Sequence, residues 1–158
     1  MCSSDLVLFG VAGWSYPDWK GVVYPRNCKD TLRAVAAQVG LIEINTTFYR
    51  PPSAKLCASW VERTADLGTC FTAKLPQEFT HDGACDPDLV RATCEGFAPL
   101  AASGRLLALL AQTNFRVLAT PNQVAHLARL RAAFADVAPL VVEVRHQTWN
   151  VQRAMDEL

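Results

Sequence analysis

Five short runs of apolar residues recur along the chain at nearly even intervals. Their first residues lie 29 to 36 positions apart, which leaves room for one crossover helix in each interval. The runs are almost continuously apolar rather than alternating, as is typical of parallel strands covered on both faces. The pattern predicts an α/β domain with five strands, at Val7–Ala12, Leu41–Ile44, Cys70–Leu75, Leu106–Ala111 and Leu140–Val144.

The segments between these runs carry helix-start signals. Ser, Thr and Asp side chains can accept the free N–H groups of a first turn, and proline fits the first helical position. His126, in the last of these segments, is predicted to lie on the surface. No linker or charge block divides the chain, so residues 1–158 are predicted to form a single domain. The predicted helices are 32–39, capped by Asp30 or Thr31, 54–64, capped by Ser53, then 86–100 and 122–134.

Two architectures accommodate five strand–helix units. A five-stranded doubly wound sheet is complete near this length, whereas a (β/α)₈ barrel needs about 250 residues. Only residues 145–158 follow the fifth apolar run, enough for a loop and a helical stub. A complete open sheet ends on a full last helix, so this ending favours a TIM-like barrel truncated before closure.

Four motifs follow one another along the chain: Gly13-Trp14-Ser15-Tyr16-Pro17-Asp18-Trp19, Glu43-Ile44-Asn45-Thr46-Thr47-Phe48-Tyr49-Arg50, Lys74-Leu75-Pro76 with Thr80-His81, and Val142-Glu143-Val144-Arg145-His146 with Trp149. In this order they resemble the motifs of the YecE-like family, a domain of unknown function numbered seventy-two. The resemblance implies a TIM-like barrel of eight strands, of which this chain supplies the first five. One departure follows the fourth strand, where Gln112 leads into Thr113-Asn114 in place of the family's proline-containing turn.

Side chains at the carboxyl ends of barrel strands converge on one mouth. Acids, bases and aromatic residues from separate units therefore meet there, as a pocket for a small polar molecule requires. The candidate catalytic residues are Glu43, Lys74, Glu143 and His146. The candidate substrate-binding residues are Trp14, Tyr16, Asn45, Tyr49, Arg50, His81, Gln112, Arg145 and Trp149.

Glu43 and Glu143 each interrupt an apolar strand, three units apart. A charge inside a buried strand is costly unless it is paired or used. The two carboxylates can do general acid–base work if burial separates their pKa values. The alternative is a pair of structural salt bridges, in which Glu43 pairs with Lys74, and Glu143 with Arg145 or another cation.

Lys74 and three aromatic residues also have two readings. Lys74 can form a Schiff base or bind an anion, or it can serve only as a salt-bridge partner. Tyr16, Tyr49 and Trp149 can stack on a sugar or base ring, or they can close the top of the barrel.

No metal is predicted, and the sequence identifies no cofactor. His81 and His146 offer imidazoles beside the glutamates, but no HxH or HExxH spacing supports a metal site. Gly10, Gly13 and Gly21 do not form the GxGxxG motif of a dinucleotide site.

Composition narrows the partners and the location. Fifteen basic and fifteen acidic residues cancel, so the chain has no electrostatic footprint of a nucleic-acid binder. The six cysteines form no CxxC pair and are predicted to be reduced thiols. No apolar run reaches the length of a membrane span, and residues 1–12 do not read as a signal peptide. The chain is therefore predicted to be cytoplasmic.

These observations leave three functional hypotheses. The first is an enzyme that acts on a small polar substrate, sugar-like or phosphorylated, at the mouth of the barrel. The second is a non-catalytic module that binds a small molecule or a nucleic-acid end through Arg50, Lys74 and Arg145. The third is an inactive gene fragment. An incomplete barrel also has two exposed sheet edges, which predict self-association.

Overall fold

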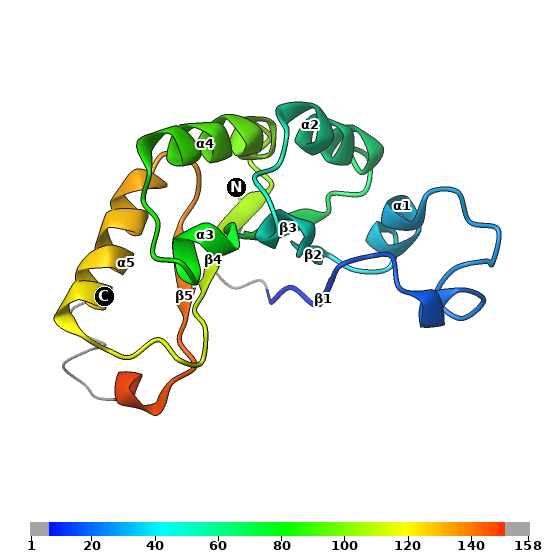
Figure 1. Ribbon diagram of the computed structural model, residues 1–158. Helices are drawn as coiled ribbons and strands as arrows, with labels where there is room; N and C mark the ends of the chain where they lie inside the picture. Colours follow the sequence, from blue (N-terminus) through cyan, green and yellow to red (C-terminus); the bar gives the residue numbers. More distant parts are fainter. Residues whose placement is uncertain (1–6, 151–158) are drawn as a thin grey trace.

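The computed structural model describes residues 7–150 and contains one five-stranded sheet (Figure 1). All neighbouring strands are parallel, and their order in the sheet is their order in the sequence. The first strand lies at an edge, which is wrong for a doubly wound sheet and right for a barrel. The predicted partial TIM-like barrel is confirmed. Its strands are β1 (Gly10–Ala12), β2 (Leu41–Ile44), β3 (Cys70–Lys74), β4 (Leu106–Gln112) and β5 (Leu140–Glu143).

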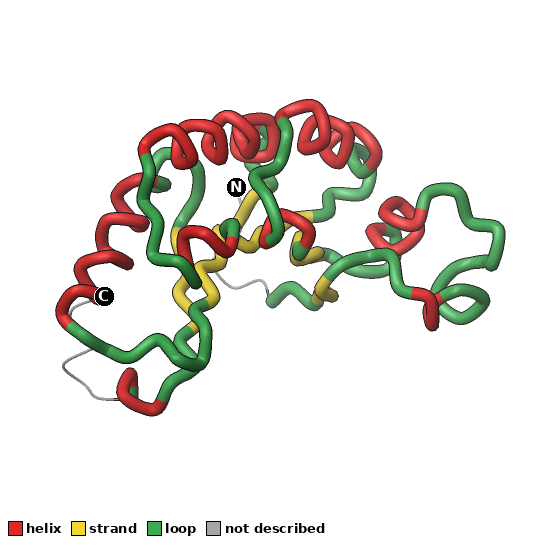
Figure 2. The backbone as a smooth tube through the Cα atoms, in the orientation of Figure 1, coloured by secondary structure: helices red, strands yellow, loops and turns green. Residues whose placement is uncertain are grey.

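The helices follow the strands in alternation. Figures 1 and 2 show α2, α4 and α5 arching over one side of the sheet, with α1 beyond β1. Short 3-10 turns follow β1, β2 and β5. The helices are α1 (Thr31–Ala36), α2 (Ala54–Arg63), α3 (Gln77–Thr80), α4 (Pro87–Ala102) and α5 (Pro121–Ala133), and the 3-10 turns are η1 (Pro17–Trp19), η2 (Thr46–Phe48) and η3 (Gln147–Trp149).

The predicted caps are present where the helices begin. Asp30 accepts a hydrogen bond from the Arg33 N–H at 2.9 Å, and Ser53 accepts one from the Leu56 N–H at 3.3 Å. Asp86 caps α4 in the same way, and Pro87 occupies its first position. Each cap satisfies a backbone donor that has no partner inside the helix.

The two faces of the strands differ in character. Ile42, Ile44, Phe71, Ala73 and Leu109 are fully buried in the hydrophobic core. Residues alternate across a strand, so the positions between them face the concave side. Those positions include the polar side chains at the carboxyl ends of the strands. The alternation therefore separates a packed layer under the helices from a polar layer at the mouth.

Two sequence-based expectations are wrong. The first strand begins at Gly10 rather than Val7, because β1 pairs with β2 over three residues only; Val7 and Phe9 are 76% and 81% exposed. His126 is not on the surface but 4% exposed in α5. Its Nε2 lies 2.7 Å from the Phe79 carbonyl oxygen, which can only accept, so Nε2 carries the hydrogen. Phe79 lies in the four-residue helix α3, whose carbonyls need partners outside the helix.

The remaining boundaries move by small amounts. The first helix ends at Ala36, three residues before the predicted end. The predicted helical stub after β5 begins with the 3-10 turn η3, and residues 151–158 lie outside the described part of the chain. None of the helices described in residues 7–150 is long and apolar enough to cross a membrane.

Candidate functional site

A continuous line of polar contacts crosses the carboxyl ends of four strands. Lys74 Nζ lies 3.7 Å from Glu43 Oε1 and donates to Gln112 Oε1 at 3.4 Å. Gln112 Nε2 donates in turn to Glu143 Oε2 at 2.7 Å, and Arg145 Nε donates to Glu143 Oε1 at 2.7 Å. We call these five residues, Glu43, Lys74, Gln112, Glu143 and Arg145, the polar row.

Strand register accounts for the polar row. Gln112 and Glu143 are paired positions on β4 and β5, so the amide faces the carboxylate directly. Glu43 pairs in register with Thr72, and Lys74 stands two residues further along the same strand and on the same face. A parallel sheet in sequence order thus aligns polar side chains that are 30 to 40 residues apart in the chain.

The charges of the polar row alternate and cancel. The hydrogen bond from Gln112 is the main cause that holds the pKa of Glu143 below its ordinary value, and Arg145 adds to it, while partial burial acts in the opposite direction. Glu143 is therefore ionised at neutral pH and can accept a proton or a hydrogen bond, but it has no proton to give. Both ion pairs of the structural alternative, Glu43–Lys74 and Glu143–Arg145, are present.

A cavity of about 340 Å³ adjoins the polar row. Asn45, at the end of β2, has a buried side-chain oxygen with no hydrogen-bond partner within residues 7–150. A buried polar atom without a partner costs free energy and marks a place to look for function. The cavity is lined by Tyr16, Asn45, Phe48, Tyr49, Lys74 and Gln112.

A second cavity, of about 230 Å³, adjoins the first and shares Tyr16 and Asn45 with it. Gly13 shapes this wall: its φ of +77° favours glycine, and a Cβ there would lie 2.8 Å from the Tyr16 hydroxyl. That hydroxyl donates to the Ala12 carbonyl at 2.5 Å, which fixes the ring at the end of β1. The second cavity is lined by Gly13, Trp14, Ser15, Tyr16, Asn45 and Thr46.

Comparison with known proteins identifies the family. The family model described as "Protein of unknown function DUF72" matches residues 8–158, almost the whole chain. The chain belongs to the DUF72 family. This confirms the resemblance to the YecE-like family that the four sequence motifs indicate. A comparison with curated proteins finds no match.

Solved DUF72 structures share the fold. A DUF72 family protein from Thermotoga maritima MSB8 is 30% identical, with a TM-score of 0.78 over 94% of this chain and 59% of its own. One from Enterococcus faecalis V583 is 24% identical, with the same TM-score, over 94% of this chain and 54% of its own. The chain thus spans somewhat more than half the length of these structures. The family description names no reaction, so only the residues of the site indicate its chemistry.

Two of the predicted residues lie apart from the cavities of this DUF72 chain. Trp149 is 1% exposed and donates its indole N–H to the Val117 carbonyl at 2.9 Å, so it packs in the core and offers no face for stacking. His146 Nδ1 accepts from the Thr148 N–H at 3.2 Å and caps η3. Its neutral ring therefore carries the proton on Nε2.

Arg50 and His81 lie next to the cavities without lining either of them. Arg50 borders a separate groove of about 350 Å³ near the start of α2. The His81 ring packs edge-on against Phe48, with the ring centres 5.1 Å apart, and its Nδ1 lies 2.9 Å from the Thr80 hydroxyl. His81 thus supports a wall of the larger cavity from behind.

Sequence reasoning missed residues that the 3-10 turn η2 places at the site. Phe48 lines the larger cavity, and Thr47 donates its hydroxyl to the Lys74 carbonyl at 2.6 Å, which ties the turn to β3. Both lie inside the motif Glu43–Arg50. The sequence feature that could have pointed to them is the unbroken polar and aromatic run directly after a strand, which is typical of a functional loop.

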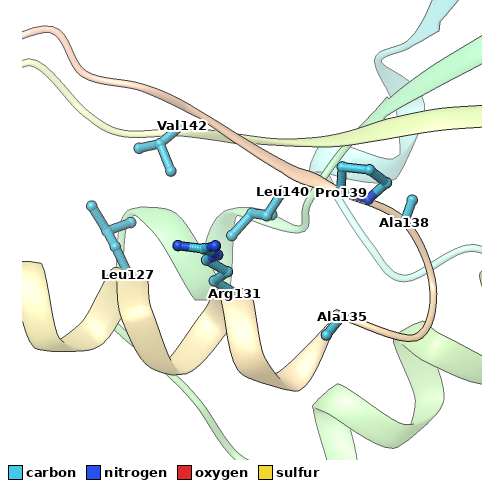
Figure 3. A pocket seen from close by; sticks show the side chains of 7 residues that line it. All are labelled: Leu127, Arg131, Ala135, Ala138, Pro139, Leu140 and Val142. Atoms are coloured by element: carbon cyan, nitrogen blue, oxygen red, sulfur yellow. The ribbon is translucent and has the colours of Figure 1, made fainter. Parts of the chain in front are cut away.

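A larger hollow, about 470 Å³, lies elsewhere. Figure 3 shows it between α5 and β5, on the helix-covered side of the last strand, with Leu140 and Val142 facing α5. Within residues 7–150, Arg131 is the only charged residue that lines it, and no member of the polar row does. This cleft lies beside the last strand of the sheet and is lined mainly by apolar side chains. Because it lacks a set of convergent polar groups, the mouth is the better candidate site.

The described residues do not gather ligands for a metal ion. Within residues 7–150, no three His, Cys, Asp or Glu side chains are close enough together to hold one. What the mouth offers instead is a carboxylate, an ammonium and an amide within contact of one another, beside aromatic rings. Such a set can bind hydroxyl groups and move a proton between neighbouring oxygens or carbons.

Proposed function

We propose that this chain forms part of an enzyme that acts on a small, uncharged, hydroxyl-rich molecule, sugar-like in character. The observation that carries this proposal is the position of Lys74, between the Glu43 carboxylate and the Gln112 amide oxygen at the rim of a cavity of about 340 Å³. The unpartnered oxygen of Asn45 on the same rim supplies a further acceptor for a hydroxyl group.

The charge balance favours a neutral ligand over a phosphorylated one. Lys74 and Arg145, the cations of the polar row, already contact Glu43 and Glu143. A phosphate group would have to displace a carboxylate from each cation and would then lie beside that carboxylate. A hydroxyl group can instead donate to a carboxylate and accept from the ammonium without breaking either pair.

Each residue of the polar row then has a defined part. Glu43, whose only charged contact within residues 7–150 is Lys74 at 3.7 Å, is the group best placed to take a proton from a substrate. Lys74 donates to the oxygen on which negative charge develops. Glu143, ionised and held by Gln112 and Arg145, keeps the Gln112 amide turned so that its oxygen faces Lys74.

The test compares aldoses with their monophosphates by isothermal titration. The wild-type chain should bind at least one aldose and should bind its monophosphate more weakly. Glu43→Gln frees Lys74, so this variant should shift the preference toward the monophosphate by roughly tenfold. Glu62→Gln, an exposed glutamate of α2, is the control and should leave the preference unchanged. Tighter binding of monophosphates by the wild-type chain would overturn the proposed neutral ligand.

Catalysis and simple binding separate in the same variants. Proton NMR of any sugar that binds should show its conversion by the wild-type chain and none by Glu43→Gln, while the variant still binds the sugar. If Glu43→Gln changes affinity alone and no conversion is seen, the chain is a binding module. If the ligand of such a module is a nucleic-acid end, a short oligonucleotide should displace the bound sugar in a competition titration.

We also propose that the chain self-associates through its open sheet edges. β5 pairs only with β4 among the described strands, and Val141 in its middle is 50% exposed. Exposed backbone groups and apolar side chains on an edge strand favour pairing with another chain. Size-exclusion chromatography should give an apparent mass that rises with concentration. Val141→Lys should lower it, and Val22→Lys, an equally apolar exposed position outside the strands, should not.

A further inference from the structure

We infer that the cavity of about 230 Å³ beside Trp14 is a second subsite, which takes the apolar ring of a two-part ligand whose hydroxyl-rich part lies over the polar row. This inference rests on the proposed function and names its ligand class: a glycoside or similar conjugate that joins a sugar-like group to an aromatic or other flat apolar group.

The lining of the second cavity carries the first step. Among residues 7–150 no charged residue lines it, and its largest lining residues are Trp14 and Tyr16. A cavity of about 150 Å³ between apolar side chains already holds a benzene molecule, so this space is large enough for one ring. Aromatic walls favour a flat apolar guest, which they can meet edge-on or in an offset stack.

Both aromatic walls are held in place before any ligand binds. Trp14 packs edge-on against Trp60 with ring centres 5.6 Å apart, and Tyr16 lies 4.8 Å from the Trp19 ring. The Tyr16 hydroxyl is bonded to the Ala12 carbonyl, and Gly13 leaves the room that this position needs. A preformed wall binds more tightly than one that must be ordered by the ligand.

The border between the two cavities consists of Tyr16 and Asn45, the two residues that line both. The Asn45 oxygen is buried there without a partner. A ligand that extends from one cavity into the other brings a hydroxyl group to this border, and a turn of the Asn45 side chain gives its oxygen a donor. The cost of the unpartnered atom in the free chain then becomes a gain on binding of a two-part ligand.

A matched set of methyl and phenyl glycosides tests the inference. Isothermal titration with a panel of common aldoses, each as both glycosides, should give phenyl glycosides that bind roughly ten- to a hundredfold tighter than their methyl partners. Ser15→Leu places an apolar side chain in the second cavity and should bring this ratio close to one. Lys55→Leu, an exposed position on α2, is the matched control and should keep the wild-type ratio.

A second readout guards against a misfolded variant. The indole N–H signal of Trp14 in ¹⁵N NMR should shift with phenyl glycosides and not with methyl glycosides, in the wild-type chain. A ratio near one in the wild-type chain, or a phenyl advantage that survives in a folded Ser15→Leu chain, would overturn the second subsite but leave the proposed function standing. Binding of neither kind of glycoside would overturn both.

Discussion

Two cations at opposite ends of the neighbouring strands β3 and β4 have very different surroundings. Arg105, just before β4, donates to the Thr64 carbonyl at 2.8 Å and the Thr64 hydroxyl at 2.9 Å, and also to the carbonyls of Thr69 and Val61. Lys74, at the far end of β3, has Glu43 at 3.7 Å and Gln112 at 3.4 Å. The first cation is saturated with close acceptors, and the second is not.

The two cations differ in the kind of group that their contacts involve. Arg105 donates to backbone carbonyls at the end of α2 and in the turn before β3, and so ties these two segments together. Lys74 keeps loose contacts beside a cavity, where a ligand oxygen can replace or join them. In barrels of this kind, residues at the amino ends of the strands contribute to stability, and residues at the carboxyl ends carry the chemistry. The contacts of these two residues agree with that division.

Replacing Arg105 should have the largest effect on stability. Arg105→Ala removes the side-chain donor to the carbonyls of Thr64, Thr69 and Val61 and to the buried Thr64 hydroxyl, and should lower the free energy of unfolding by about 3 kcal/mol. Urea unfolding followed by circular dichroism measures this change. Arg91→Ala removes an exposed arginine of α4 whose partners are surface acids, and should cost about 0.5 kcal/mol or less. Equal losses in the two variants would contradict the comparison.

His126 provides the next largest effect, at the carboxyl side of the sheet. His126→Leu removes the donor to the Phe79 carbonyl and should cost about 1 to 2 kcal/mol in the same urea experiment. His126→Gln can restore a donor and should recover part of the loss. A His126→Leu chain as stable as the wild type would show that this hydrogen bond does not contribute.

Lys74 should matter little for stability and much for binding. Lys74→Met should change the free energy of unfolding by about 1 kcal/mol, because its contacts are long and Glu43 can still reach water. The same variant should lose sugar binding in the titrations described above. A loss of stability as large as that of Arg105→Ala would make Lys74 a structural residue. The amino and carboxyl ends of the strands would then no longer differ in what their cations do.

The smallest effect concerns the pKa of Glu143. Because the hydrogen bond from Gln112 is the main cause of its lowered pKa, Gln112→Leu should raise that pKa toward its ordinary value of 4.5. Carbon-13 NMR titration of the carboxyl groups follows this directly. A lowered folded-state pKa stabilises the chain above the unfolded value, and this stability is lost as the pH falls through the folded value. Stability differences between the variant and wild type should therefore shrink below pH 4.5.

The elements of the fold could be predicted, and the surroundings of single residues could not. Continuous apolar runs and the caps at Asp30 and Ser53 report local preferences, which the chain keeps in its folded state. The burial of Trp149 and His126 depends on hydrogen bonds to carbonyls far away in the sequence. Trp149 bonds to the Val117 carbonyl and His126 to the Phe79 carbonyl, and no local pattern predicts either contact. The same holds for Gln112, which was predicted as a substrate ligand and also links Lys74 to Glu143.

Candidate site residues divide in the same way. Glu43 and Glu143 stand out in the sequence as candidates because an acid inside an apolar strand is conspicuous. Phe48 and Thr47 belong to a polar and aromatic run after a strand, but only the 3-10 turn brings Phe48 to the cavity and Thr47 to the Lys74 carbonyl. The second cavity depends on the left-handed backbone conformation of Gly13. Glycine permits this conformation but also adopts others, so the sequence alone does not predict it.

The order of the strands has a consequence for synthesis. Each strand pairs with the one made just before it, so the sheet can grow in the direction in which the ribosome delivers the chain. At roughly 5–20 residues per second, a new strand–helix unit emerges every ~2 to 7 seconds, far longer than a helix needs to form. Every nascent edge therefore waits for its next strand while exposed to the cell.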